Sequence, residues 1–131
     1  MRAILTAAGA SAVAAGLGEV ALVLGAERLD SKTRGAPGAG IALAGFILLA
    51  FVLVVPLTSG LAGGLASREP HAVIGSVAGL YGASLVGLLL AGARVESPSI
   101  LPVLLGIGAL SVLTVIGHFL AIAIRVPAVQ R

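Results

Sequence analysis

The chain contains one run of 33 residues, from Gly35 to Ser67, without a single charged side chain. A membrane-spanning helix needs only about 20 apolar residues, so this run exceeds one straight span and is too short for two. Pro56 lies inside the run and lacks a backbone donor, which predicts a long, tilted helix with a kink near this residue. The alternative is a discontinuous helix that lines a cavity, with the hydroxyls of Thr58 and Ser59 bonding to the freed carbonyls.

Three further apolar stretches account for almost all of the remaining chain. Hydrophobic residues make up 59% of the sequence and charged residues 10%, and the mean hydropathy is +1.18. A soluble domain of this length needs a polar surface that such a composition cannot supply. We therefore predict an all-α, multi-pass integral membrane protein of one domain, residues 1–131, in the cell membrane and in contact with its lipids. Its predicted spans are residues 3–25, 39–66, 72–92 and 100–124, and short connections favour an up-down-up-down bundle of four helices.

The polar segments between the spans are short, and the longest is the predicted loop Ala26–Gly38. Because the basic residues are spread singly, we expect no nucleic acid to bind through a basic patch. The basic residues also divide equally between the two predicted sides of the bilayer, which leaves the orientation open. Arg2, Arg68, Arg125 and Arg131 lie on one side, and Arg28, Lys32, Arg34 and Arg94 lie on the other. The first residues also fit a cleavable signal peptide, but we expect retention because the apolar run continues to Gly25.

Small residues recur every four positions along the predicted third span, where they form one smooth helix face. These residues are Gly75, Gly79, Ala83, Gly87 and Ala91. Helices in a bilayer associate by close packing, so this face predicts a close helix–helix contact, within the chain or with another subunit. The first span carries two similar rows, Thr6-Ala10-Ala14-Gly18 and Ala7-Ser11-Ala15-Glu19. We expect these faces to favour assembly with copies of the chain or with other membrane subunits.

Glu19 is the one acidic residue inside the first apolar stretch. An ionised carboxylate is costly in hydrocarbon, so we expect this side chain to be neutral, paired or turned to a watery cavity. One interpretation is a neutral carboxyl group that bonds to a neighbouring backbone or hydroxyl group. The other is a group that couples transport to a proton or an ion.

The predicted fourth span carries a polar stripe formed by Ser111, Thr114 and His118, with Arg125 beyond them on the same face. This stripe predicts a surface that faces water or a partner, and His118 alone would fit a satisfied interior histidine. His71 begins the third span and reaches a depth similar to that of His118, and two axial histidines on facing helices can hold haem. No further haem signature accompanies them, so we expect no cofactor.

No catalytic or metal site is visible in the sequence. The chain has no cysteine, and its hydroxyls and histidines are expected to lie singly on apolar helices, without a nucleophile–base pair. We therefore predict that the protein is not an enzyme and binds no metal.

Two local likenesses and one likeness of composition bear on function, and none assigns the chain to a family. The stretch AVAAGLGEV (Ala12–Val20) resembles the glycine-rich first helix of rotary-ATPase proteolipids, and SREP (Ser67–Pro70) looks like their polar turn. Four spans, Glu19 in the first of them and the segment LPVLLG (Leu101–Gly106) are similar to small multidrug-resistance transporters, which implies an essential role for Glu19. The Gly/Ala-rich composition also resembles that of conjugation-type pilins, which implies packing into a filament.

These observations favour a non-catalytic small membrane subunit. It is expected to pack through its Gly/Ala faces into a homo-oligomer, a filament or a larger membrane complex. The alternative is a small proton- or ion-coupled transporter in which Glu19 is the intramembrane carboxylate.

Overall fold

A computed structural model of the protein describes residues 1–33, 38–90 and 100–124, which are almost entirely helical. Helix α1 spans Arg2–Thr33, α2 spans Ala39–Ala66, α3 spans Val73–Leu90 and α4 spans Ile100–Ile124. A short 3-10 helix, η1 (Pro70–Ala72), precedes α3. The predicted all-α chain with four long apolar helices is confirmed, because each of the four is long and apolar enough to cross a membrane.

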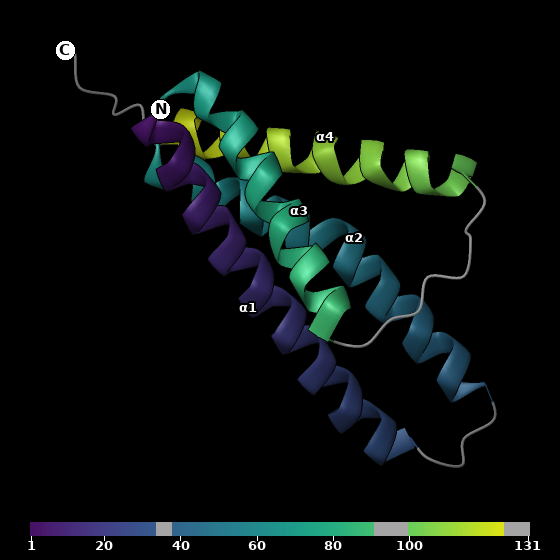
Figure 1. Ribbon diagram of the computed structural model, residues 1–131. Helices are drawn as coiled ribbons and strands as arrows, with labels where there is room; N and C mark the ends of the chain where they lie inside the picture. The colour runs from purple at the N-terminus through teal and green to yellow at the C-terminus, as the bar shows by residue number, and fades with distance from the viewer. Residues whose placement is uncertain (34–37, 91–99, 125–131) are drawn as a thin grey trace.

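Helix α1 packs along both α2 and α3, and α2 packs along both α1 and α4. Helices α3 and α4 meet only briefly, because the first half of α4 diverges from α3 (Figure 1). A small apolar core lies where the helices converge and consists of Ala15, Val55 and Leu80, with Leu110 packed against it. This core lies near the middle of α1, and the close contacts of Gly63 and Gly75 lie between it and the end of the molecule near the N-terminus.

The C-terminal end of α1 differs from the sequence-based expectation. We predicted a loop from Ala26, but α1 continues without interruption to Thr33. Glu27, Arg28 and Lys32 have good helix propensity, so a charged stretch that follows a formed helix extends it readily. The Ser31 hydroxyl donates to the Arg28 carbonyl over 2.8 Å and is satisfied within the same helix. A run of charges ended the apolar span but not the helix.

Helix α2 runs continuously through Pro56, so the discontinuous alternative is not observed. The Thr58 hydroxyl donates to the carbonyls of Val54, over 2.8 Å, and Val55, over 3.1 Å. Ser59 instead points away from its own helix and bonds to Ser11 of α1. The two hydroxyls after the proline thus have different roles, one local and one between helices. The kink itself stays a prediction.

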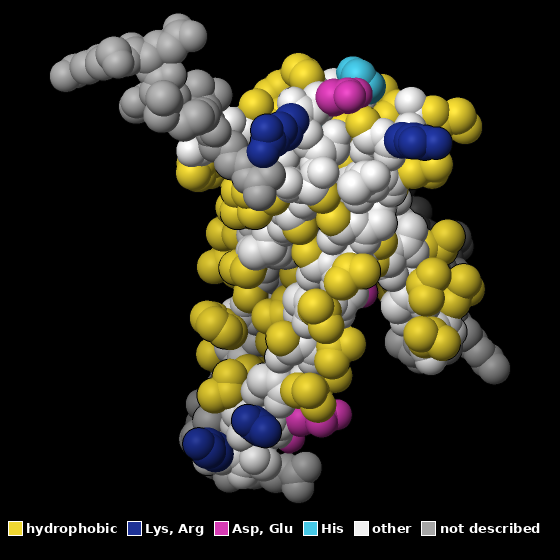
Figure 2. Space-filling view, turned by 90° about the vertical axis from the view of Figure 1, so that its left-hand side faces the viewer, with side chains coloured by type: hydrophobic (Ala, Val, Ile, Leu, Met, Phe, Trp, Pro, Cys, Tyr) yellow, Lys and Arg dark blue, Asp and Glu magenta, His cyan; other side chains and the backbone are white. Residues whose placement is uncertain are grey.

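Large hydrophobic side chains are exposed along all four helices. Even in the most apolar window of each helix, no more than 22% is buried within the chain. Figure 2 shows hydrophobic side chains along the length of the visible face, with charged side chains gathered at its two ends. The interior of this protein is therefore small, and its few fully buried groups show where the helices pack most closely.

Candidate functional site

Four polar side chains, one from each long helix, meet in the interior and form what we call the polar junction. Ser11 comes from α1, Ser59 from α2, Ser76 from α3 and His118 from α4, and all four are fully buried. The Ser11 hydroxyl bonds to the Ser59 hydroxyl and donates to the Ser76 carbonyl over 2.5 Å. Ser59 also donates to the Ser11 carbonyl over 3.2 Å, and Ser76 Oγ lies 2.8 Å from His118 Nδ1. The junction thus links all four helices through one connected set of hydrogen bonds.

Glycines let the helix backbones approach closely around this junction. A Cβ at Gly63 of α2 would overlap Ser76 Oγ, and one at Gly64 would overlap the His118 carbonyl. On α4, a Cβ at Gly117 would lie 2.5 Å from the Leu57 carbonyl. These glycines let α2 approach α3 and α4 closely enough for serine and histidine side chains to form hydrogen bonds between the helices.

The junction corrects the expectation that the hydroxyls and histidines lie singly. Ser76 and His118 form a hydroxyl–imidazole pair, the combination that can serve as nucleophile and base. Both side chains are fully buried, however, and Gly63 packs directly on Ser76 Oγ. A substrate carbonyl therefore has no room beside this hydroxyl in the arrangement described. One ring atom, His118 Nε2, is buried and makes no hydrogen bond with any of the described residues.

Glu19 is placed on the side of α1 that faces α3. Its Oε1 accepts a hydrogen bond of 2.7 Å from the Ser84 hydroxyl, and the residue is half-buried. A Cβ at Gly87 would lie 2.7 Å from Oε2, so this glycine makes room for the carboxyl group. Ser76 and Ser84 are eight residues apart on α3, which separates Glu19 from the polar junction by about 12 Å of helix rise. Glu19 and His118 therefore lie at different depths.

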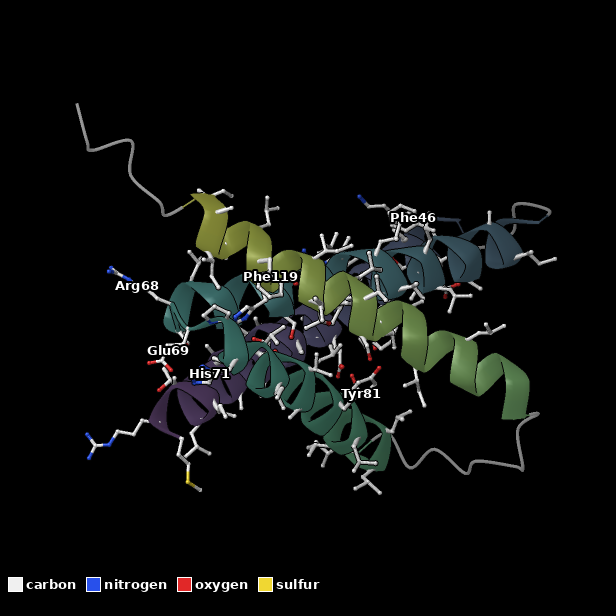
Figure 3. All side chains as sticks on the ribbon, turned by 90° about the horizontal axis from the view of Figure 1, so that it is seen from above. Phe46, Arg68, Glu69, His71, Tyr81 and Phe119 are labelled. Carbon is white, nitrogen blue, oxygen red and sulfur yellow. The ribbon has the colours of Figure 1, made fainter. Side chains whose placement is uncertain are left out.

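The predicted polar stripe of α4 divides between three local environments. His118 joins the junction, and Thr114 is fully buried and donates to the Leu110 carbonyl of its own helix over 2.8 Å. Ser111 bonds to the Tyr81 hydroxyl over 2.8 Å, and Tyr81 also donates to the Ile107 carbonyl over 2.6 Å. Figure 3 shows Tyr81 reaching from α3 towards α4. Arg125 lies outside the described residues.

The small-residue face of α3 packs against α1 of the same chain. A Cβ at Gly75 would overlap the Ile4 carbonyl, and one at Gly79 would overlap the Ala8 carbonyl. Ala83 packs on the apolar core, Gly87 faces Glu19, and Ala91 lies outside the described residues. The periodic pattern therefore marks a close contact within the chain, between α1 and α3.

The two histidines lie in different surroundings. His71 is 59% exposed in the segment that joins α2 to α3, and its Nε2 is 2.7 Å from Glu69 Oε2. Figure 3 shows these two side chains together at one end of the bundle. His118 is interior and its Nδ1 is bonded to Ser76, so the arrangement considered for haem, two axial ligands on facing helices, does not match these contacts. Among the described residues, no group of three or more His, Cys, Asp or Glu side chains could hold a metal ion.

Sequence reasoning identified His118 and Glu19 but missed the serines that meet the histidine. A signal was present, because Ser11, Ser59 and Ser76 are hydroxyl residues inside apolar runs. In such a run a hydroxyl either bonds back to its own helix or finds a partner on another, and periodicity alone does not decide between them. Comparison of the chain with protein-family models, curated proteins and solved structures gives no match.

Proposed function

We propose that this chain is a multi-pass integral membrane protein whose four helices cross the bilayer in alternating directions. Exposed hydrophobic side chains along every helix and charges gathered at the two ends support this proposal (Figure 2). Contacts between the helices support the alternation. Ser11 meets Ser59 and Gly18 meets Val55, so α1 and α2 run antiparallel, and Ser76 and Tyr81 contact α4 in antiparallel order.

The function that the geometry supports best is that of a non-catalytic subunit that assembles with copies of itself or with other membrane helices. The observation that carries this proposal is a second set of helical glycines, at which an added Cβ would meet no atom of the described residues within 4 Å. They occur on all four long helices and are Gly9, Gly16, Gly25, Gly40, Gly45, Gly82, Gly106 and Gly108. A glycine inside a helix lowers the stability of the helix by about 1 kcal/mol relative to alanine. Close packing within the chain does not explain the glycines at these positions. On a lipid-facing surface, such glycines permit another helix to approach closely.

Enlarging the outer face of α1 tests the assembly proposal. Gly9 and Gly16 lie seven residues apart on one side of the helix, and a Cβ at either position would meet no atom of the described residues within 4 Å. We expect Gly9→Leu with Gly16→Leu to leave each monomer folded and to reduce the oligomer fraction at least tenfold in native mass spectrometry after gentle extraction. Ala21→Leu, at another exposed position of α1, is the matched control. A monomeric wild-type protein, or an unchanged oligomer in the double variant, would contradict the proposal.

Glu19 supports a second candidate, a proton- or ion-coupled transporter. This carboxyl group lies well inside a long apolar helix, is held by Ser84, and has a glycine opposite its second oxygen. Ionisable groups at such depth often serve transport. In reconstituted vesicles, Glu19→Gln should abolish proton-dependent flux, whereas Glu27→Gln, at an exposed position of the same helix, should not change it. Flux that survives the Glu19 substitution would exclude this role.

A further inference from the structure

Three packed apolar side chains, which we call the apolar layer, separate the polar junction from Glu19 inside the bundle. They are Ala15 of α1, Val55 of α2 and Leu80 of α3, and each is at most 1% exposed. On α1, Ala15 lies one turn after Ser11 of the junction and one turn before Glu19. Each of the three residues also lies near the middle of its predicted span.

Helix α3 shows the same alternation of polar, apolar and polar groups. Ser76 bonds to His118 in the junction, and Ser84, eight residues later, donates to Glu19. Leu80 lies midway between the two serines on the same face of the helix. A hydroxyl group at this position would complete a row of polar groups from the junction to Glu19. Leu80 is therefore the residue that interrupts the row.

Helix α4 closes the remaining side of the apolar layer. Thr114 is fully buried here, but its hydroxyl donates to the Leu110 carbonyl of its own helix, and Leu110 packs on the layer. Tyr81 and Ser111 bond to each other on the Glu19 side of the layer. Further along this side α4 diverges from α3 (Figure 1), and Figure 2 shows an open notch there. The layer is thus the closed section between this notch and the polar junction.

We propose that the apolar layer is the permeability barrier of the bundle, in which Leu80 keeps protons from passing between Glu19 and the polar junction. The proposal rests on the membrane crossing proposed above, and it applies to an assembly subunit as well as to a transporter. A proton moves between hydrogen-bonding groups, and the three hydrocarbon side chains offer none. A hydrated ion would lose its water here without any replacement.

Proton entry into sealed vesicles tests the barrier. The vesicles enclose a pH-sensitive dye, and a potassium diffusion potential drives protons inwards in the absence of any other substrate. The wild-type chain should leave the entry rate within about twofold of that of empty vesicles, and Leu80→Ser should raise it roughly tenfold or more. Adding Glu19→Gln to Leu80→Ser should remove most of this increase, because the carboxyl group at the end of the row is lost.

Two substitutions on α3 serve as matched controls. Leu80→Met keeps an apolar side chain of similar volume in the layer, and Leu88→Ser places the same new hydroxyl at an exposed position of the helix. Neither should change proton entry. If Leu80→Ser does not fold, Val55→Thr decides, because threonine has nearly the shape of valine and adds a hydroxyl group to the layer. It should raise proton entry roughly threefold.

A leak through the wild-type chain, no leak through a folded Leu80→Ser protein, or a leak that survives Glu19→Gln would overturn the proposal. The same variants also carry either Ser31→Cys or Arg68→Cys, at exposed positions near opposite ends of the bundle. Complementary labelling of these two thiols by an impermeant maleimide, in vesicles without a leak, counts against the barrier alone. Full labelling of both from outside counts instead against membrane crossing.

Discussion

Ser76 is the residue through which α3 takes part in the polar junction. Its carbonyl accepts from Ser11 and its hydroxyl reaches His118, so one residue of α3 contacts both α1 and α4 through hydrogen bonds. Buried hydrogen bonds each contribute about 1 kcal/mol, but a buried polar atom that loses its partner costs more than the bond contributed. Removal of both partners of a junction bond should therefore cost less stability than the sum of the two single removals.

A double-mutant cycle at Ser76 and His118 tests this expectation. Ser76→Ala leaves Nδ1 unpaired and should lower the free energy of unfolding by about 1–3 kcal/mol, and His118→Leu should have a similar effect. The double variant removes both polar groups, so its loss should be smaller than the sum by at least about 0.5 kcal/mol. Reversible unfolding in mixed micelles measures all four proteins. Strictly additive losses would mean that the Ser76–His118 bond has no energetic coupling.

Thr6→Ala is a suitable control for that cycle. Thr6 is exposed and donates to the Arg2 carbonyl of its own helix over 2.9 Å. Removal of such a hydroxyl from the surface should change the unfolding free energy by no more than about 0.5 kcal/mol. A large effect here would indicate that the method responds to local helix changes rather than to the junction.

At the scale of the element, α3 carries glycines of two kinds three residues apart. Gly79 lies directly against the α1 backbone at Ala8, whereas a Cβ at Gly82 would meet no atom of the described residues within 4 Å. The same substitution should therefore have opposite effects at the two positions. Gly79→Ala should lower the unfolding free energy by about 1–3 kcal/mol, because the helices must separate to admit a methyl group. Gly82→Ala should be neutral or stabilising by up to about 1 kcal/mol, because alanine favours the helix.

Thermal unfolding of the two alanine variants, compared with the wild-type protein under identical detergent conditions, decides between these expectations. Loss of stability at Gly82 rather than at Gly79 would mean that α3 presents the opposite face to α1. An oligomer contact at Gly82 would show as a loss of assembly without a loss of monomer stability. The two readouts therefore separate packing within the chain from packing between chains.

The sequence predicted the elements better than their partners. The four-residue spacing of Gly75, Gly79, Ala83 and Gly87 predicted a close contact, and that contact exists. The helix that packs on this face is α1. The spacing does not predict which helix that is, because a face of small residues can pack closely against any neighbouring helix. The predicted end of the first helix is wrong, because the prediction equated the first charge after the apolar run with the end of the helix. Helix propensity, unlike hydropathy, does not change at a membrane boundary.

The candidate site was predictable only in part for a similar reason. Glu19 and His118 are conspicuous because an ionisable side chain in an apolar run is rare. Serines are common there, and Ser11, Ser59 and Ser76 are separated by 48 and 65 residues from the partners that they meet. Local sequence holds no information about contacts at such separation. The serine–histidine pair emerged only when the packing of the four helices was known.

For the whole molecule, membrane crossing predicts that residues at opposite ends react from opposite sides. Ser31 is exposed near the end of α1, and Arg68 is exposed between α2 and η1. The chain has no cysteine, so Ser31→Cys and Arg68→Cys each introduce a single reactive thiol. In sealed vesicles, a membrane-impermeant maleimide should label the two variants in complementary fractions. Full labelling of both from outside would contradict a crossing between these positions, even if chains insert in both orientations.

Val20→Cys provides the matched control for that experiment. Val20 is 57% exposed on the surface of α1, but it lies within the apolar segment. A thiol there should react poorly with the charged reagent both before and after the vesicles are opened with a pore-forming agent, and well only after detergent is added. Rapid labelling of this position in intact vesicles would place the middle of α1 in water.

The positions of the junction residues along the chain also determine the order in which the polar junction can form during synthesis. Ser11 leaves the ribosome 65 residues before Ser76, whose carbonyl it will bond, and His118 follows Ser76 by a further 42 residues. At about 5–20 residues per second, Ser11 waits roughly 3–13 s for that partner. The last helix to emerge completes the junction. Until then the nascent chain holds a half-formed polar centre, and this interval is when a neighbouring chain or an insertion factor can contact it.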